Sequence, residues 1–129
     1  MNNENSGKIK SFTDLDAWKE GHKLVLMVYK ETENFPQKEM FGLTSQMRRA
    51  AVSITSQIAE GFSRQSYKEK IQFYCISQGS NTELQNQLLI AKDVGYLKNE
   101  SFNRIAAQSV KAQKLMNGLI KKSRSILNS

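Results

Sequence analysis

A single proline, Pro36, occurs among the 129 residues, and only seven glycines accompany it. Proline cannot continue a helix, and glycine is common in tight turns. A chain with so few of either residue has few turns and long secondary-structure elements. The sequence therefore favours a small number of long helices, within a length that fits one domain.

Apolar residues at helical spacing predict a first helix from about residue 14 to about residue 33. Thr13 and Asp16 resemble a capping box at its start. Asn34–Pro36 ends the helix, because the residue before a proline avoids the helical conformation. The expected core face comprises Leu15, Trp18, His22, Val25 and Tyr29.

The second predicted helix carries the most regular apolar stripe in the chain. It begins near residues 40–42 and ends at Gly61, a residue type that commonly follows the last helical turn. The stripe consists of Leu43, Met47, Ala50, Ala51, Ile54 and Ile58.

The third predicted helix runs from about residue 67 to about residue 94, with Gly95 as its stop, and is apolar on several sides. Such a helix is buried on several sides. A monomer of four helices buries only the inner face of each helix, so the pattern indicates subunit contacts. The segment 78–82 also fits a loop between two shorter helices. We expect one continuous helix, in which Gly79 and Ser80 permit close approach of another helix.

The fourth predicted helix begins near Asn99 and ends near residue 126. The three connections lie at about residues 34–41, 62–66 and 95–99. Short connections give antiparallel neighbours. The sequence therefore predicts an all-α fold, an antiparallel up-down-up-down four-helix bundle over residues 12–127, preceded by a disordered N-terminal arm at residues 1–11.

The C-terminal segment has a one-sided charge. From Ser101 to Ser129 there are six Lys or Arg and no Asp or Glu, whereas residues 1–100 hold 13 basic and 12 acidic residues. Five of the six fall in an arc of roughly 100° beside the apolar face. These five are Arg104, Lys111, Lys114, Lys121 and Lys122. Such a stripe attracts polyanions without base-specific contacts; the alternative is that it serves solubility alone.

No aromatic residue interleaves with this stripe, so we expect contact with a nucleic-acid backbone and no platform for stacked bases. Arg48 and Arg49 are the next candidates for phosphate contact, with a solvated face as the alternative. Because adjacent residues of a helix point about 100° apart, we expect one of the pair to bond within the protein and the other to face solvent.

Glu60, Arg64 and Glu83 are interpreted as a buried structural ion-pair network that fixes register or subunit geometry. A catalytic role of the two carboxylates on phosphate is the alternative. His22 is interpreted as a packed histidine and Cys75 as a small buried hydrophobe, because no second ligand has the spacing of a metal site. Without a phosphate loop, a nucleophile elbow or a helix of paired carboxylates, we expect no catalytic residue, no metal, no cofactor and no enzyme activity.

No apolar run approaches the roughly 18 residues of a membrane span. The polar N-terminus lacks the apolar segment of a signal peptide, and a single cysteine cannot form an intramolecular disulfide. We therefore expect a cytoplasmic protein without membrane contact.

Several segments are shared with one family. They are FTDLDAW at Phe12–Trp18, NFPQKEMFGL at Asn34–Leu43, QMRRAAVSI at Gln46–Ile54, IAEGFSR at Ile58–Arg64 and GSNTEL at Gly79–Leu84, followed by Gly95, Tyr96 and Leu97. Together they cover roughly residues 12–125, and the chain resembles the small bacterial 23S ribosomal RNA intervening sequence proteins. One departure is Lys98, where the family often has Ser or Thr as a helix cap; Asn99 is expected to take that role.

The resemblance implies a left-handed four-helix bundle assembled as a homopentameric ring. Relatives include the accessory protein of diversity-generating retroelements, which partners a reverse transcriptase, and this relationship implies nucleic-acid binding. The molecular function of most members is not established, so the resemblance speaks to the fold more than to the activity.

These observations predict a non-enzymatic, oligomeric accessory protein that contacts the backbone of RNA or DNA through basic helix surfaces. The alternative is a protein-interaction scaffold that docks a reverse transcriptase or another nucleic-acid enzyme. The expected partners are further copies of the chain, as a pentamer, and RNA or DNA.

Overall fold

The computed structural model describes residues 8–129, and within that range it contains four long α-helices and no strand. The helices are α1 (Asp16–Thr32), α2 (Leu43–Ser63), α3 (Tyr67–Asp93) and α4 (Asn99–Leu127), with the short 3-10 helices η1 (Phe12–Asp14) and η2 (Gln37–Glu39). The prediction of an all-α fold is confirmed for these residues. Of the expected disordered arm at residues 1–11, residues 1–7 lie outside the described residues.

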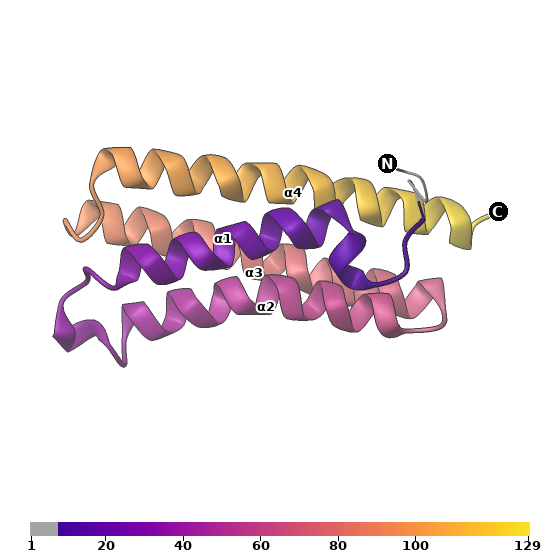
Figure 1. Cartoon of the computed structure of the whole chain (residues 1–129), viewed down its shortest axis with the longest axis horizontal. Coiled ribbons are helices and arrows are strands. Elements are labelled where there is room, and N and C mark those ends of the chain that lie inside the picture. Colours follow the sequence, from indigo (N-terminus) through magenta and orange to yellow (C-terminus); the bar gives the residue numbers. More distant parts are fainter. Residues whose placement is uncertain (1–7) are drawn as a thin grey trace.

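The four helices lie side by side along one long axis (Figure 1). The α1–α2 and α3–α4 connections lie at one end, which we call the loop end. The opposite end holds the start of α1, the α2–α3 connection and the end of α4; we call residues 8–19, 60–70 and 114–129 the terminal end. Each helix contacts two others, in the order α1, α2, α3, α4 and back to α1. The end of α4 therefore lies at the same end of the molecule as two other segments that are distant in sequence.

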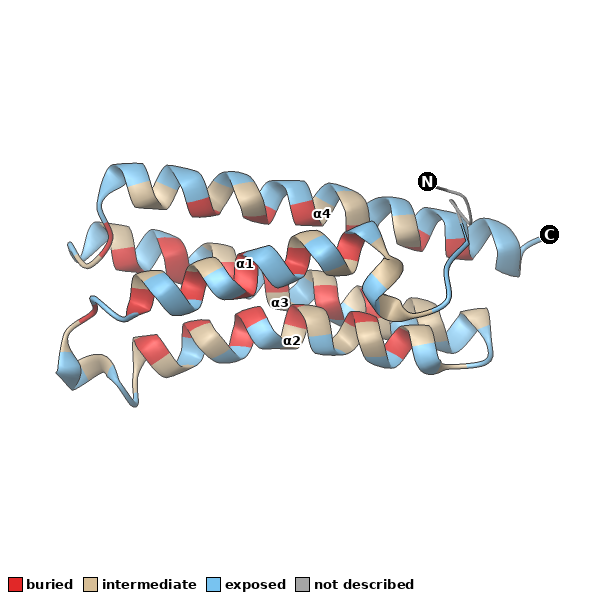
Figure 2. Cartoon of the chain, viewed as in Figure 1, coloured by how far each residue is buried: buried red, intermediate tan, exposed pale blue. Residues whose placement is uncertain are grey.

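The core is formed by the inward faces of all four helices (Figure 2). The largest fully buried apolar side chains are Leu24, Met47, Ile54, Ile58, Leu84, Leu88, Ile105 and Met116. Burying a side chain of this size stabilises a fold by about 1.5–3 kcal/mol relative to leaving it exposed. The predicted stripe of α2 is confirmed, because all of its members except the partly buried Leu43 lie in this core.

The start of the first helix differs from the prediction. The capping box uses Ser11 and Asp14 in place of Thr13 and Asp16, and Asp14 Oδ2 accepts from the Ser11 N–H at 3.1 Å. This box opens η1, and the chain then becomes extended at Leu15, with φ −74° and ψ 130°. The α-helix itself begins only after that extended residue, which changes the face that it buries.

The buried face of α1 is rotated from the expected one. It comprises Ala17, Gly21, Leu24, Val25, Val28 and Thr32. His22 and Tyr29, expected in the core, are exposed. The His22 ring stacks on Trp18 with centroids 4.7 Å apart, and Tyr29 lies under the Arg48 guanidinium at 4.7 Å. Rings with a polar edge pack well at a half-wet surface, so their spacing alone did not identify the core.

Gly61 does not end α2, which continues to Ser63. A Cβ atom at Gly61 would lie 2.8 Å from Tyr74 Cε1 and 2.9 Å from Phe73 Cβ, so the glycine permits the close packing of α2 on α3. Gly95 does act as the predicted stop of α3. Its φ of +90° favours glycine, and the Tyr96 N–H behind it bonds to the Ala91 carbonyl at 2.9 Å.

The third helix is continuous through Gly79, as predicted. Within the described chain nothing lies within 4 Å of a Cβ built at Gly79, so this glycine makes no close helix contact there. Ser80 does meet α2, with its Oγ 2.7 Å from Ser53 Oγ. At the start of α4, Lys98 occupies the cap position without a side-chain hydrogen bond, and Asn99 is the first helical residue and not the expected cap.

A buried polar network joins α3 to α4 at mid-length. Asn81 Nδ2 donates to the Ser109 carbonyl at 3.0 Å and to Gln113 Oε1 at 3.1 Å. Ser109 Oγ donates to Asn81 Oδ1 at 2.8 Å and accepts from Gln85 at 2.8 Å. Asn81 and Ser109 are fully buried, so these bonds satisfy groups that would otherwise be costly to remove from water.

Candidate nucleic-acid interface

All five residues of the predicted basic stripe are exposed on α4. The structure divides them into two groups. Arg104 Nη2 lies 3.5 Å from Glu31 Oε1, and Lys111 Nζ lies 3.4 Å from Glu20 Oε1. Both acidic partners belong to α1, the neighbour of α4, so they are close in space although distant in sequence. This half of the stripe is partly neutralised.

Glu20 is held as an anion by its surroundings. Gln108 donates to Glu20 Oε1 at 3.0 Å, and Lys23 Nζ lies 3.3 Å from Glu20 Oε2. The hydrogen bond from Gln108, followed by the bond and charge of Lys23 and the charge of Lys111, lowers the pKa of Glu20 below its usual value. A carboxylate that stays ionised competes with a phosphate for Lys111.

The other half of the stripe has no ion pair among residues 8–129. Lys114 and Lys122 line a hollow of about 260 Å³ against residues 15–17 at the start of α1. Lys121 lines another hollow, of about 400 Å³, on the opposite side of α4 beside Arg124. These lysines thus flank the exposed ridge of α4 within the terminal end.

The terminal end carries most of the excess positive charge. It holds ten basic residues and four acidic residues, whereas residues 20–59 and 71–113 hold nine basic and seven acidic residues. The basic ones are Lys8, Lys10, Lys19, Arg64, Lys68, Lys70, Lys114, Lys121, Lys122 and Arg124, and the acidic ones are Asp14, Asp16, Glu60 and Glu69. Sequence reasoning located the α4 part of this surface and missed the rest, because residues 8–19 and 60–70 reach it only through the fold.

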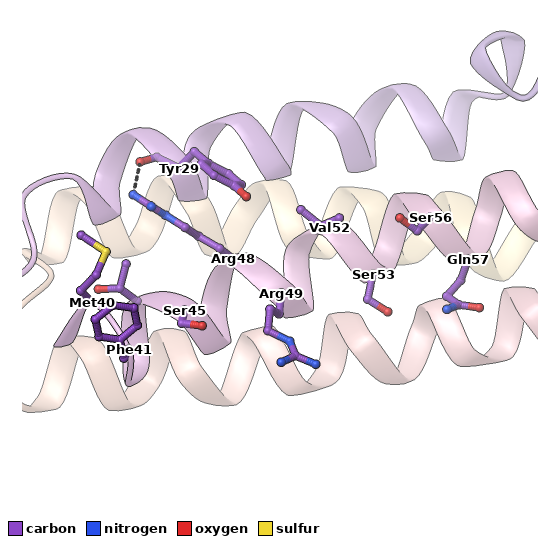
Figure 3. A pocket seen from close by; sticks show the side chains of 11 residues that line it. Tyr29, Met40, Phe41, Ser45, Arg48, Arg49, Val52, Ser53, Ser56 and Gln57 are labelled. Carbon is purple, nitrogen blue, oxygen red and sulfur yellow. Dashed lines mark hydrogen bonds between the residues drawn. The ribbon is translucent and has the colours of Figure 1, made fainter.

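Arg48 and Arg49 separate as predicted. Arg48 bonds within the protein: its Nε donates to Thr32 Oγ1 at 2.9 Å, and its Nη2 points to the Tyr29 carbonyl (Figure 3). Arg49 is exposed on the outer face of α2, where it lines a hollow of about 630 Å³. Phe41 lines the same hollow and is 96% exposed. Of this pair, Arg49 is the side chain available to a phosphate.

The expected network of Glu60, Arg64 and Glu83 is not assembled within the described chain. Glu60 Oε2 and Arg64 Nη2 form an ion pair at 2.7 Å, but both side chains are about half exposed, so the pair is not buried. Glu83 lies one helix away and accepts a hydrogen bond from Gln87 at 3.4 Å. Glu83 therefore does not join the pair within one chain, and a role of these residues in subunit geometry stays a prediction.

The residues considered for chemistry are dispersed. His22 lies on the outer surface of α1, and Cys75 is a free, partly buried thiol on α3. Residues 8–129 contain no group of three or more His, Cys, Asp or Glu side chains arranged to hold a metal ion. None of the helices in the same range is long and apolar enough to cross a membrane.

Three comparisons with known proteins bear on this architecture. Residues 13–118 match the family model described as 23S rRNA-intervening sequence protein. A crystal structure of a protein of unknown function from the S23 ribosomal protein family of Bacteroides thetaiotaomicron has a similar fold, with a TM-score of 0.73 and 22% sequence identity. The similarity covers 81% of this chain and 98% of the other. The comparison with curated proteins found no match.

Proposed function

Because this chain belongs to the 23S rRNA-intervening sequence protein family, and because its unpaired lysines gather at one end of the bundle, we propose that it is a non-enzymatic accessory protein that binds the backbone of RNA or DNA. The observation that carries the proposal is the charge of the terminal end, where ten basic side chains accompany four acidic ones. The proposed contacts are made by Lys114, Lys121 and Lys122, with Arg49 as an outlying contact.

The proposed mechanism is electrostatic capture. Each lysine that neutralises a phosphate releases a condensed counterion, so log affinity falls linearly with log salt, by about 0.9 per contact on duplex DNA. Such contacts carry no sequence information. Binding should therefore tolerate changes of sequence and weaken steeply as salt rises.

The test compares two double variants of equal charge. Lys114→Glu with Lys121→Glu alters the terminal end, and Lys30→Glu with Lys38→Glu alters exposed lysines at the loop end. Fluorescence anisotropy with a labelled RNA and a labelled duplex DNA is measured between about 50 and about 200 mM salt. We expect the first variant to bind more weakly and to reduce the salt slope by about 2, while the second keeps most of the parent's slope.

Two outcomes contradict the proposal. Absence of binding to both probes at the lowest salt leaves solubility as the role of the charge. An equal loss of affinity in the two double variants shows that binding depends on the net charge and not on the terminal end. Circular dichroism of each variant excludes unfolding as the cause.

We further propose that the chain forms a homopentameric ring of antiparallel four-helix bundles, which multiplies the basic ends available to one nucleic acid and raises avidity without new contacts. Apolar side chains on the outer face of α3 support an assembly: Ile76 is 51% exposed and Val94 is 56% exposed. With Ile90 they fall within an arc of about 40° at helical spacing. Gly79 and Glu83 lie near the same face, where a second helix could approach closely.

A specific observation favours a second candidate function, that of a scaffold docking a nucleic-acid enzyme. Phe41 is almost wholly exposed at the end of the hollow on α2, and aromatic residues dominate the energetics of protein interfaces. Replacing Phe41 by Ser distinguishes the two candidate functions. If the protein is a scaffold, the Phe41→Ser variant loses its protein partner and keeps its affinity for RNA. Loss of RNA affinity alone contradicts the scaffold.

A further inference from the structure

A hollow of about 160 Å³ opens at the terminal end, where the α2–α3 connection meets α4 and the residues before η1. Phe62 lines it from the last turn of α2, and Tyr67 lines it from the first turn of α3. Leu119 and Ile126 line it from α4, and the buried Tyr74 also contributes. A cavity of about 150 Å³ in another protein holds one benzene ring. The hollow is therefore the size for a single ring system.

Two amines accompany these apolar walls. Lys122 is exposed at the hollow, without an ion pair among the described residues. Lys70 is partly buried, and its Nζ donates to the Phe62 carbonyl at 2.7 Å. The same Nζ lies 5.3 Å from the Phe62 ring centroid and 5.7 Å from that of Tyr67. Partial burial lowers the pKa of Lys70 below its usual value.

An aromatic and aliphatic hollow beside cations matches the chemistry of a nucleotide within a strand. A base has a flat apolar face that stacks on aromatic rings, and its phosphates lie on both sides of it. The terminal end supplies the complementary charge for those phosphates. A duplex keeps its bases stacked inside, so only a single strand or an unpaired end can offer one.

We propose that this hollow receives one unstacked base of a single-stranded nucleic acid whose phosphates contact Lys122 and its basic neighbours. The inference rests on the proposed function and adds strandedness to it. It departs from the expectation of backbone contact alone: no aromatic interleaves with the stripe along α4, but Phe62 of α2 and Tyr67 of α3 line the same hollow as Lys122.

The first test uses the native protein with three labelled probes. These are a single strand of about ten nucleotides, the same strand with abasic positions, and a duplex of the same length. Stacking of one base on aromatic side chains should make the ordinary strand bind roughly fivefold to a hundredfold more tightly than the abasic strand. Equal affinity for all three probes overturns the base pocket but leaves backbone binding intact. Absence of binding to every probe overturns both proposals.

The second test locates the base. A single strand carrying 5-iodouracil is photo-crosslinked to the native protein, and the modified residue is found by mass spectrometry. We expect the crosslink at Tyr67 or Phe62. A crosslink at Tyr29 or Phe41, or none at the hollow, overturns the proposal.

A matched pair of variants completes the design. Tyr67→Ala should remove the preference for the ordinary strand over the abasic strand. Tyr29→Ala should keep that preference, because Tyr29 is an exposed tyrosine at the separate hollow of about 630 Å³ beside Arg49. If Tyr67→Ala does not fold, the probe comparison and the crosslink on the native protein still decide the question.

Discussion

One carboxylate joins two connections at the loop end. Glu39 Oε1 accepts from the Leu43 N–H at 3.1 Å, and Glu39 Oε2 accepts from the Tyr96 hydroxyl at 2.9 Å. The bond from Leu43, and then the bond from Tyr96, lowers the pKa of Glu39 below its usual value. The side chain thus fixes the start of α2 against the α3–α4 connection, a role that neither segment reveals alone in the sequence.

This pairing predicts a dependence of stability on pH. A carboxyl whose folded pKa is lowered stabilises the fold above its unfolded pKa, which is 4.5 for a glutamate, and that contribution is lost as pH falls through the folded value. Glu39→Gln should lower the melting temperature at about pH 7 and flatten its fall between about pH 5 and about pH 3. Glu33→Gln, at an exposed position, is the control. Parallel melting curves for Glu39→Gln and the parent would contradict the prediction.

The glycines give a second prediction at this scale. Gly61→Ala should destabilise the fold by about 1–3 kcal/mol, because the added Cβ overlaps side chains of α3. Gly118→Ala, on α4, should stabilise it by about 0.5–1 kcal/mol, because no described atom lies within 4 Å of the added Cβ and alanine is the better helix former. Urea unfolding of both variants measures the sign of each change in the free energy of unfolding. Equal effects would mean that helix propensity alone governs both positions.

Among the helices, α3 shows how the sequence can mislead about a buried face. Its inward side includes Ser77, Asn81 and Gln87 as well as Leu84 and Leu88, so no apolar stripe marks it. Asn81 bonds to residues of α4, and Ser77 donates to the Ile54 carbonyl of α2. Single-sequence periodicity does not record such pairs between helices. The stripe of α2 contains only apolar residues at its centre and was predicted correctly. On α4, the acidic partners from α1 were missed for the same reason as the polar partners of α3.

The polar network predicts a large effect of one substitution. Asn81→Ala removes the acceptor of the buried Ser109 hydroxyl and one of the two donors to Gln113, leaving only their bonds from Gln85. An unsatisfied buried group costs about 1–3 kcal/mol. Asn86→Ala, at an exposed position on the same helix, should change the free energy of unfolding by less than about 0.5 kcal/mol. Equal free energies of unfolding for the two variants in urea would show that the network contributes little.

At the scale of the whole molecule, the family and the order of the helices followed from short motifs and short connections, whereas the candidate surface did not. Phe62, Tyr67 and Lys122 meet only when α2, α3 and α4 are assembled, and the distance along the chain from the first two residues to Lys122 hides the relationship. The outward apolar residues of α3 were visible in the sequence as a surplus of apolar residues over those that one buried face of the helix needs. The proposed ring would cover them with further copies of the chain.

That surplus gives the prediction for assembly. Light scattering at micromolar concentration should give a mass several times the 14.7 kDa of one chain, and five times that mass for the proposed pentamer. Ile76→Asp should dissociate it, because burying an unpaired charge at an interface is costly. Asn86→Asp, an exposed substitution of the same charge on α3, should leave the mass unchanged. A monomer in the parent protein would contradict the proposed ring.

The uneven charge along the bundle also makes each molecule an electric dipole. A polyanion attracts the positive end of such a dipole and repels the other end, so an approaching protein molecule turns its terminal end toward the polyanion. In that orientation the long axis of the bundle points away from the polyanion. The opposite pole, where Phe41 is almost wholly exposed, then faces the surrounding solution, so a molecule captured by its charge presents its exposed aromatic ring outward to whatever it meets next.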